Sequence, residues 1–198
     1  RDCLLSRGLG DVYKRQLLYI RKGVRIENLI CGGAQERNKR AGTENVAGIV
    51  GLDAALQLAV DGMDERNAKL EKMRDRLIDG LLKIERSRIN GDRVHRLPGN
   101  VNMCFEGIEG ESLLLRLDLK GVSASSGSAC TSGSLDPSHV LLAIGLPHEI
   151  AHGSLRLTLS EKNTMEEIDY TVDELKKIIE RLRGMSPLYE DFVKKQNQ

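Results

Sequence analysis

SASSGSACTSGS, at residues 123–134, is the stretch that says most about this chain. Its small side chains and two glycines give the backbone wide conformational freedom, and nothing bulky in the sequence shields the thiol of Cys130. A cysteine that collects an atom at one site and delivers it at another needs such a tether. The alternative is an incidental thiol in a surface loop, although an exposed free cysteine is open to oxidation. The residues alone leave both interpretations open.

Regular patterns on both sides of this loop predict a mixed α/β fold. Residues 101–105 and 155–159 are predicted as strands, the second from its alternation of apolar and polar residues. Thr164 and Glu167 form a capping box that opens a long C-terminal helix. Further helices are expected at residues 43–60, 64–84, 111–119 and from Pro137 onward, with Asp64 and Asp136 as N-caps, together with a β-prone run at residues 17–20.

The composition argues against several classes of function. Among 198 residues, 30 are basic and 29 acidic, so the net charge is +1 and no polyelectrolyte partner such as nucleic acid is implied. Aromatic residues make up 3%, too few for base stacking, and no run approaches the roughly 18 apolar residues of a membrane span. The first residues are too charged for a secretory signal. No C-x-x-C pair occurs among the four cysteines, which predicts reduced thiols in a cytoplasmic protein.

Several motifs in a fixed order resemble the cysteine desulfurases, in the branch that supplies iron–sulfur cluster assembly. They are SGSACTS at 126–132, DPSHV at 136–140, LYIRKG at 18–23, RAGTEN at 40–45 and LPGNVN at 97–102. The resemblance implies the small C-terminal α/β domain of a fold-type I transferase that depends on pyridoxal phosphate (PLP), plus the end of its large domain. We therefore expect residues 17–60 to end the large domain, residues 61–198 to form the small one, and residues 1–16 to be foreign or artefactual.

The same resemblance implies a chemistry and three site residues. Cys130 would attack the sulfur of L-cysteine bound to PLP, leaving L-alanine and a Cys130 persulfide for an iron–sulfur scaffold or other acceptor protein. Cys130 could also ligate a transient 2Fe–2S cluster. Thr43 would contact the cofactor phosphate of the neighbouring subunit in a homodimer, and Arg156 would bind the substrate α-carboxylate. Without the resemblance, Thr43 fits a plain N-cap and Arg156 a solvated strand arginine.

The chain offers no match for the lysine that holds PLP in this family. That lysine lies in a Ser-x-His-Lys motif a few residues before the segment that resembles residues 18–20, where this chain has GDVYKRQ at residues 10–16. Lys14 lacks the serine, the histidine and the following glycines. We therefore expect this polypeptide alone to have no desulfurase activity, and turnover of L-cysteine to alanine by the 198-residue chain would refute that expectation.

Two other functions are alternatives. HEIAH at residues 148–152 matches the H-E-x-x-H signature of zinc hydrolases, with Glu174 as a conceivable third ligand. The proline before the motif and the glycine after it leave little more than one helical turn, which disfavours a zinc site. The other alternative is a non-catalytic fragment that carries sulfur or docks on a scaffold protein. Cys31 and Cys104 follow apolar residues and are predicted to be packed.

Overall fold

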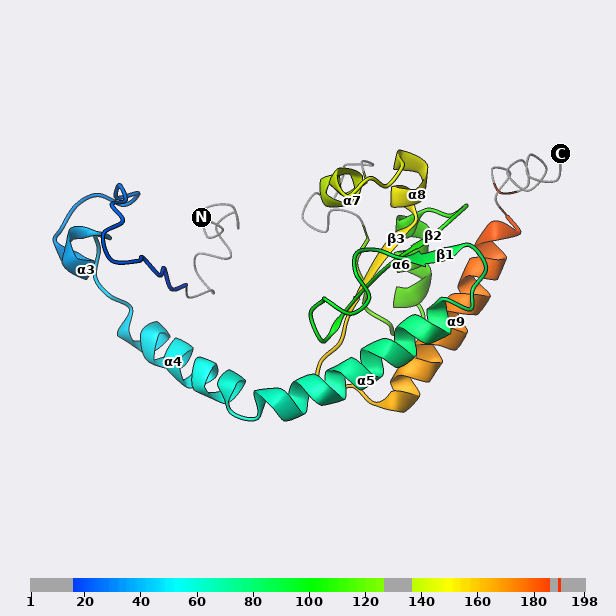
Figure 1. Ribbon diagram of the computed structural model, residues 1–198, viewed down its shortest axis with the longest axis horizontal. Coiled ribbons are helices and arrows are strands. Elements are labelled where there is room, and N and C mark those ends of the chain that lie inside the picture. Colours follow the sequence, from blue (N-terminus) through cyan, green and yellow to red (C-terminus); the bar gives the residue numbers. More distant parts are fainter. Residues whose placement is uncertain (1–15, 127–136, 186–188, 190–198) are drawn as a thin grey trace. The chain divides into compact units, whose positions relative to one another are not determined.

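The computed structural model describes residues 16–126, 137–185 and 189 (Figure 1). The chain forms two compact units, residues 1–63 and residues 64–198. Among the described residues, every buried hydrophobic side chain except Ala41 belongs to the second unit. The second unit therefore has a hydrophobic core of its own.

The second unit is built on a three-stranded antiparallel sheet with the order β1-β2-β3. The central strand β2 (Asn100–Phe105) pairs with β1 (Ser87–Ile89) on one side and β3 (Ser154–Thr158) on the other. The two predicted strands are confirmed to within one residue at each end. β1, only three residues long, was not predicted.

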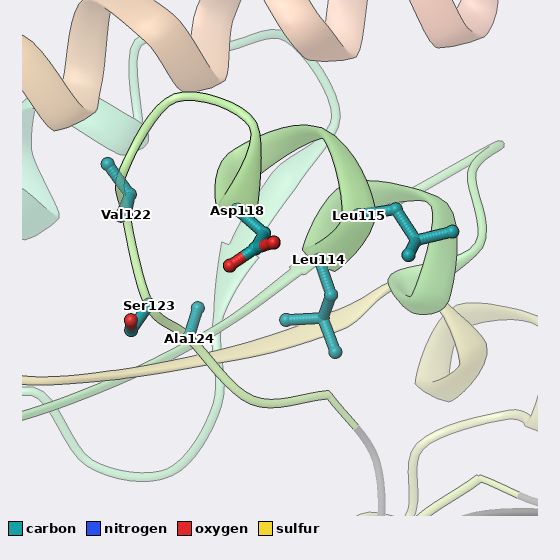
Figure 2. A pocket seen from close by; sticks show the side chains of 6 residues that line it. All are labelled: Leu114, Leu115, Asp118, Val122, Ser123 and Ala124. Carbon is teal, nitrogen blue, oxygen red and sulfur yellow. The ribbon is translucent and has the colours of Figure 1, made fainter.

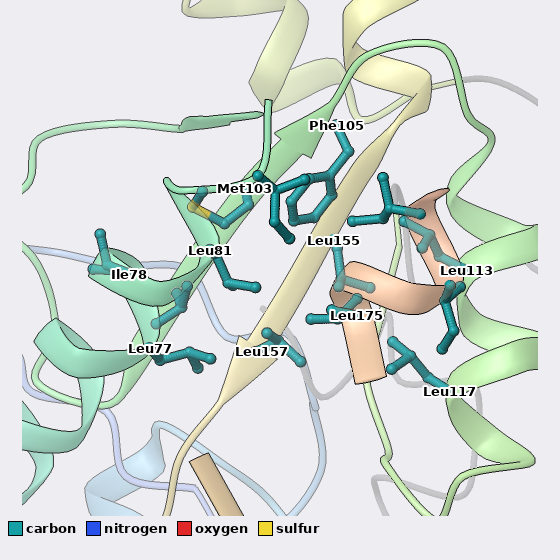
Figure 3. Packing of buried hydrophobic residues seen from close by; sticks show 14 of the residues in the cluster. Leu77, Ile78, Leu81, Met103, Phe105, Leu113, Leu117, Leu155, Leu157 and Leu175 are labelled. Carbon is teal, nitrogen blue, oxygen red and sulfur yellow. The ribbon is translucent and has the colours of Figure 1, made fainter. Parts of the chain in front are cut away.

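Three helices cover one face of this sheet and form the core with it (Figure 3). They are α5 (Met63–Leu81), α6 (Gly110–Asp118) and α9 (Met165–Arg183), and each presents an apolar stripe at spacings of three and four residues. Burying one large aliphatic side chain completely stabilises a fold by about 1.5–3 kcal/mol. The completely buried side chains include Met73, Leu77, Ile78, Leu81, Met103, Phe105, Leu113, Leu117, Leu155, Leu175 and Ile179.

The opposite face of the sheet is covered over only part of its area. A smaller cluster joins Cys104 of β2 to Leu141, Leu146 and Ala151, which come from α7 (His139–Ala143), α8 (His148–His152) and their connection. Farther along β3, residues 156 and 158 are exposed on this face, whereas residues 155 and 157 are buried in the core. Strand alternation thus leaves a polar strip on the sheet beside the helices α7 and α8.

The ends of the helices test the predicted caps. The capping box of α9 is confirmed, because the Thr164 hydroxyl accepts from the Glu167 N–H and the Glu167 carboxylate accepts from the Thr164 N–H. Asp64 is not an N-cap: α5 begins one residue earlier, directly after a turn at Gly62, where φ is 68°. The N-cap of α7 is Ser138, so the predicted start of that helix at Pro137 is also wrong.

Helix α4 (Val46–Val60) of the first unit confirms the helix expected at residues 43–60. Its N-cap is Asn45, whose side-chain oxygen accepts a hydrogen bond of 2.8 Å from the backbone N–H of Gly48. Thr43 therefore lies two residues before the cap. None of the residues of α4 is buried, although apolar side chains occur all round it.

The segment before α4 contains little regular structure. Residues 17–19 are exposed and Ile20 is half-buried. Residues 17–20 form no strand, because no other segment among the described residues pairs with them, so that prediction is wrong. The short segment α3 (Gln35–Asn38) contains left-handed backbone at Glu36 and Arg37. Within the described residues, no single helix is long and apolar enough to cross a membrane, although α4 and α5 taken together reach that length and composition.

Candidate functional site

Arg156 projects from the polar strip of the sheet, as the alternation of β3 predicts. Its side chain is exposed, and Asn102 of β2 lies directly opposite it in the strand register. Among the described residues, no carboxylate forms an ion pair with its guanidinium. A guanidinium has five N–H donors in a fixed plane, a geometry that matches a carboxylate. Arg156 is therefore available to an anionic ligand.

The stretch that leads to Cys130 begins on the strand that carries Arg156. Ser125 forms an isolated antiparallel bridge with Arg156: the Ser125 N–H donates to the Arg156 carbonyl at 3.0 Å, and the Arg156 N–H donates to the Ser125 carbonyl at 2.6 Å. In addition, Nη2 of Arg156 donates to the Ser125 hydroxyl at 3.3 Å. The sequence did not predict this pairing.

The next residue of the stretch is also held against the fold. Gly110, the first residue of α6, lies so close to Ser126 that a Cβ on Gly110 would be 2.8 Å from the Cβ of Ser126 and 2.8 Å from the carbonyl oxygen of Ser154. At the other end, Pro137 is buried. The flanks of the span at residues 127–136 are thus attached to the second unit. Cys130 itself lies outside the described residues.

A shallow hollow of about 280 Å³ lies between α6 and the segment that leads to Ser125 (Figure 2). Its lining contains one carboxylate, that of Asp118, and no basic side chain, so it does not suit a substrate carboxylate. The lining residues are Leu114, Leu115 and Asp118 of α6, followed by Val122, Ser123 and Ala124. The polar strip around Arg156 is the better candidate for an anionic substrate.

The two described cysteines differ sharply in their surroundings. Cys104 is completely buried, and the side-chain amide of Asn90 donates to its sulfur at 3.1 Å. Burial raises the pKa of the Cys104 thiol, so this group stays protonated and is a poor nucleophile. The prediction that Cys104 is a core residue is confirmed. The same prediction for Cys31 is wrong: that thiol is exposed, because the segment around it buries almost nothing, and it donates to the Asn28 carbonyl.

Thr43 is exposed and precedes the N-cap of α4 by two residues. Gly42 directly before it has a φ of 101°, a conformation that glycine adopts without strain. The first N–H groups of a helix lack partners within the helix and, with the helix dipole, favour an anion. A hydroxyl at this point has the chemistry to contact a phosphate.

The H-E-x-x-H motif forms helix α8, which is only five residues long. The ring centroids of His148 and His152 lie 5.0 Å apart. Glu174, the conceivable third ligand, is bound by two lysines, with its carboxylate 2.6 Å from Lys177 and 3.0 Å from Lys120. Among the described residues, no group of three potential ligands could hold a metal ion. The geometry therefore does not favour a zinc hydrolase.

Comparison with known proteins agrees with this arrangement of elements. Residues 20–171 match the family described as aminotransferase class-V, so the chain belongs to that family. Within it, the chain is similar to proteins named cysteine desulfurase IscS. It is 59% identical over 184 residues to the one from Clostridium botulinum, covering 91% of this chain and 46% of that protein. It is 60% identical over 171 residues to the one from Methanosarcina thermophila, covering 86% and 42%.

Solved structures give the same result for the fold. A NifS-like protein superposes with a TM-score of 0.72 at 37% identity, covering 83% of this chain and 42% of that one. The NifS-like protein of Rickettsia africae superposes with a TM-score of 0.70 at 31% identity, covering 79% and 41%. The predicted fold class and the resemblance to cysteine desulfurases are thereby confirmed. The chain spans about half the length of the curated relatives that it matches.

Proposed function

We propose that this chain is the C-terminal portion of a PLP-dependent cysteine desulfurase that converts L-cysteine to L-alanine and passes the sulfur on for iron–sulfur cluster assembly. The observation that supports this best is the bridge between Ser125 and Arg156. It attaches the segment leading to the thiol to an exposed arginine that has no carboxylate partner in the described part of the chain. An amino-acid substrate held at Arg156 would therefore lie beside the root of the Cys130 loop.

Each site residue has a distinct task in this proposal. Arg156 binds the α-carboxylate of L-cysteine through paired N–H donors and so orients the substrate. The thiolate of Cys130 attacks the substrate sulfur: an S–S bond forms, the C–S bond breaks, and the carbon skeleton leaves as L-alanine after protonation. The persulfide on Cys130 then passes its outer sulfur to the thiol of an acceptor protein.

The described residues fit part of a PLP site. The exposed hydroxyl of Thr43, close to the start of α4, has the donor chemistry for the phosphate group. When bound, PLP supplies an electron sink that takes up the electron pair of the broken C–S bond. In the proposed homodimer, Thr43 contacts the cofactor of the neighbouring subunit.

Four finer points belong to the same proposal: the sulfur acceptor, a transient cluster, the division into domains and the location in the cell. The sulfur acceptor is an iron–sulfur scaffold or a related carrier protein, and Cys130 ligates a transient 2Fe–2S cluster during transfer. Residues 17–60 end the large domain and residues 61–198 form the small domain. The absence of C-x-x-C pairs in the sequence supports a reducing, cytoplasmic location.

The test uses the enzyme extended to the length of its relatives, with Cys130→Ser as the variant and Cys31→Ser as the control for an exposed thiol. We expect Cys130→Ser to reduce alanine formation and sulfur transfer on the order of 100-fold or more, because the nucleophile is lost, while Cys31→Ser stays near wild type. Alanine is quantified from L-cysteine, and sulfur is followed as a labelled persulfide on the acceptor. Unchanged transfer by Cys130→Ser would contradict the proposal. Transfer from a donor persulfide without alanine formation would instead indicate a sulfur carrier.

A further inference from the structure

The side chain of Arg156 is oriented by one hydrogen bond in the described part of the chain. Nη2 of Arg156 donates to the hydroxyl of Ser125 at 3.3 Å. The backbones of these two residues also exchange two hydrogen bonds, one in each direction. The bond uses one of five N–H donors, so at least one pair of donors stays available for a carboxylate. An exposed arginine without such a bond would sample several rotamers before a ligand binds.

The position of Ser125 follows from the residues on either side of it. Val122 and Ala124 pack against the hydrophobic core. Alternation along an extended segment then directs the Ser125 side chain to the opposite face, which is the face of Arg156. The close approach of Ser126 to Gly110 holds the segment on its other flank. The Ser125 hydroxyl therefore lies beside the guanidinium on a backbone that is hydrogen-bonded to β3 and closely packed against the start of α6.

We infer that Ser125 is a positioning residue for substrate binding: its hydroxyl fixes the guanidinium of Arg156 in the orientation that receives the substrate carboxylate. This inference rests on the proposed function and adds to it the residue that pre-orients the arginine. Ser125 also lies at the start of the segment that leads to Cys130. In this proposal the same residue therefore contacts the arginine that binds the carboxylate and begins the loop that carries the thiol.

The test measures substrate binding and turnover in the enzyme extended to the length of its relatives. Ser125→Ala removes the hydroxyl, Ser125→Thr retains it, and Ser123→Ala is the matched control, since Ser123 is exposed two residues earlier and lines the hollow beside α6. We expect Ser125→Ala to raise the KM for L-cysteine about three- to tenfold while kcat stays within about twofold. Ser125→Thr and Ser123→Ala should both resemble the wild type.

A second readout separates positioning from a general structural effect. L-Alanine carries the carboxylate that Arg156 binds, whereas L-alaninamide carries a neutral amide in its place. Ser125→Ala should raise the KI of L-alanine about as much as the KM for L-cysteine, roughly three- to tenfold, and leave the KI of L-alaninamide unchanged.

The outcomes distinguish this inference from the proposed function. An active wild type whose Ser125→Ala variant keeps the same KM and the same KI for L-alanine overturns the positioning role alone. Equal weakening of both inhibitors, or a fall in kcat without a rise in KM, overturns it as well, because a structural defect would act in that way. A wild type that forms no alanine from L-cysteine overturns the proposed function and this inference together.

Discussion

Replacing Gly153 by alanine tests how closely β2 and β3 approach each other at the end of the sheet. Gly153 has φ of −80° and ψ of 20°, a negative-φ conformation that is allowed for alanine, so the backbone conformation itself does not require glycine. A Cβ at this position, however, would lie 2.1 Å from the carbonyl oxygen of Phe105. Real Cβ atoms essentially never lie closer than 3.0 Å to such an atom. The strands must therefore separate by about 0.9 Å, the difference between 3.0 Å and 2.1 Å.

That separation stretches the hydrogen bond in which the Phe105 N–H donates to the Gly153 carbonyl at 2.9 Å. Forcing an extra carbon into a packed site costs about 1–3 kcal/mol, and losing one hydrogen bond costs about 1 kcal/mol. Alanine returns about 0.4–1 kcal/mol by reducing the freedom of the unfolded chain. The free energy of unfolding should therefore fall by about 1–3.6 kcal/mol in Gly153→Ala.

Gly184→Ala is the matched control, because Gly184 also has a negative φ, −64°, but a Cβ there would meet no atom of the described residues closer than 3.5 Å. This variant should be as stable as the wild type or more stable by about 0.4–1 kcal/mol. Urea unfolding followed by circular dichroism at 222 nm measures both variants, and hydrogen exchange at the Phe105 amide locates the change. Equal stability of the two variants would refute the steric explanation.

Two further predictions concern buried charged side chains. Hydrogen bonds from Lys177 and Lys120 hold the pKa of Glu174 below its ordinary value of 4.5. The ionised carboxylate therefore stabilises the folded state above pH 4.5, and this stabilisation is lost as the pH falls through the lower pKa of the folded state. Acidification from neutral pH should therefore destabilise the wild type more than Glu174→Gln, as measured by thermal unfolding across this pH range. Arg183 donates to three backbone carbonyls in the turns before β1 and after β2. Arg183→Met should therefore lower the free energy of unfolding by about 2–4 kcal/mol. Arg181 is exposed, so Arg181→Met should change the free energy of unfolding little in the same urea assay.

The sequence predicted the elements that depend only on residues close together in the chain. The capping box at Thr164 and Glu167 and the alternation around Arg156 both depend on neighbours in sequence, and both appear in the structure as expected. At the start of α4 two short polar residues compete for the cap. Asn45 takes it because its amide oxygen reaches the N–H of Gly48, and the sequence alone does not decide between Asn45 and Thr43.

Elements that depend on tertiary pairing could not be predicted in this way. Strand β1 has only three residues, too few for an alternation to be recognised, and exists because it pairs with β2. Residues 17–20 have stronger β propensity than β1, yet they form no strand among the described residues. Propensity therefore ranks these two segments in the wrong order, because pairing and burial decide whether a strand forms.

The short chain length between Ser125 and Cys130 supports the proposed chemistry. Cys130 follows Ser126 by four residues in the sequence, and an extended chain covers at most about 3.6 Å per residue, so four residues of any chain span at most about 14 Å. Ser126 directly follows the residue whose hydroxyl contacts the guanidinium of Arg156. In the proposed function, a small amino acid bound by Arg156 would therefore lie within reach of a four-residue segment that starts at Ser126. The proposal therefore assigns different tasks to the two parts of this segment. The glycines and serines of residues 126–134 would let the thiol move, whereas Ser125 would be held in place, because an arginine that binds a substrate gains precision from rigid support.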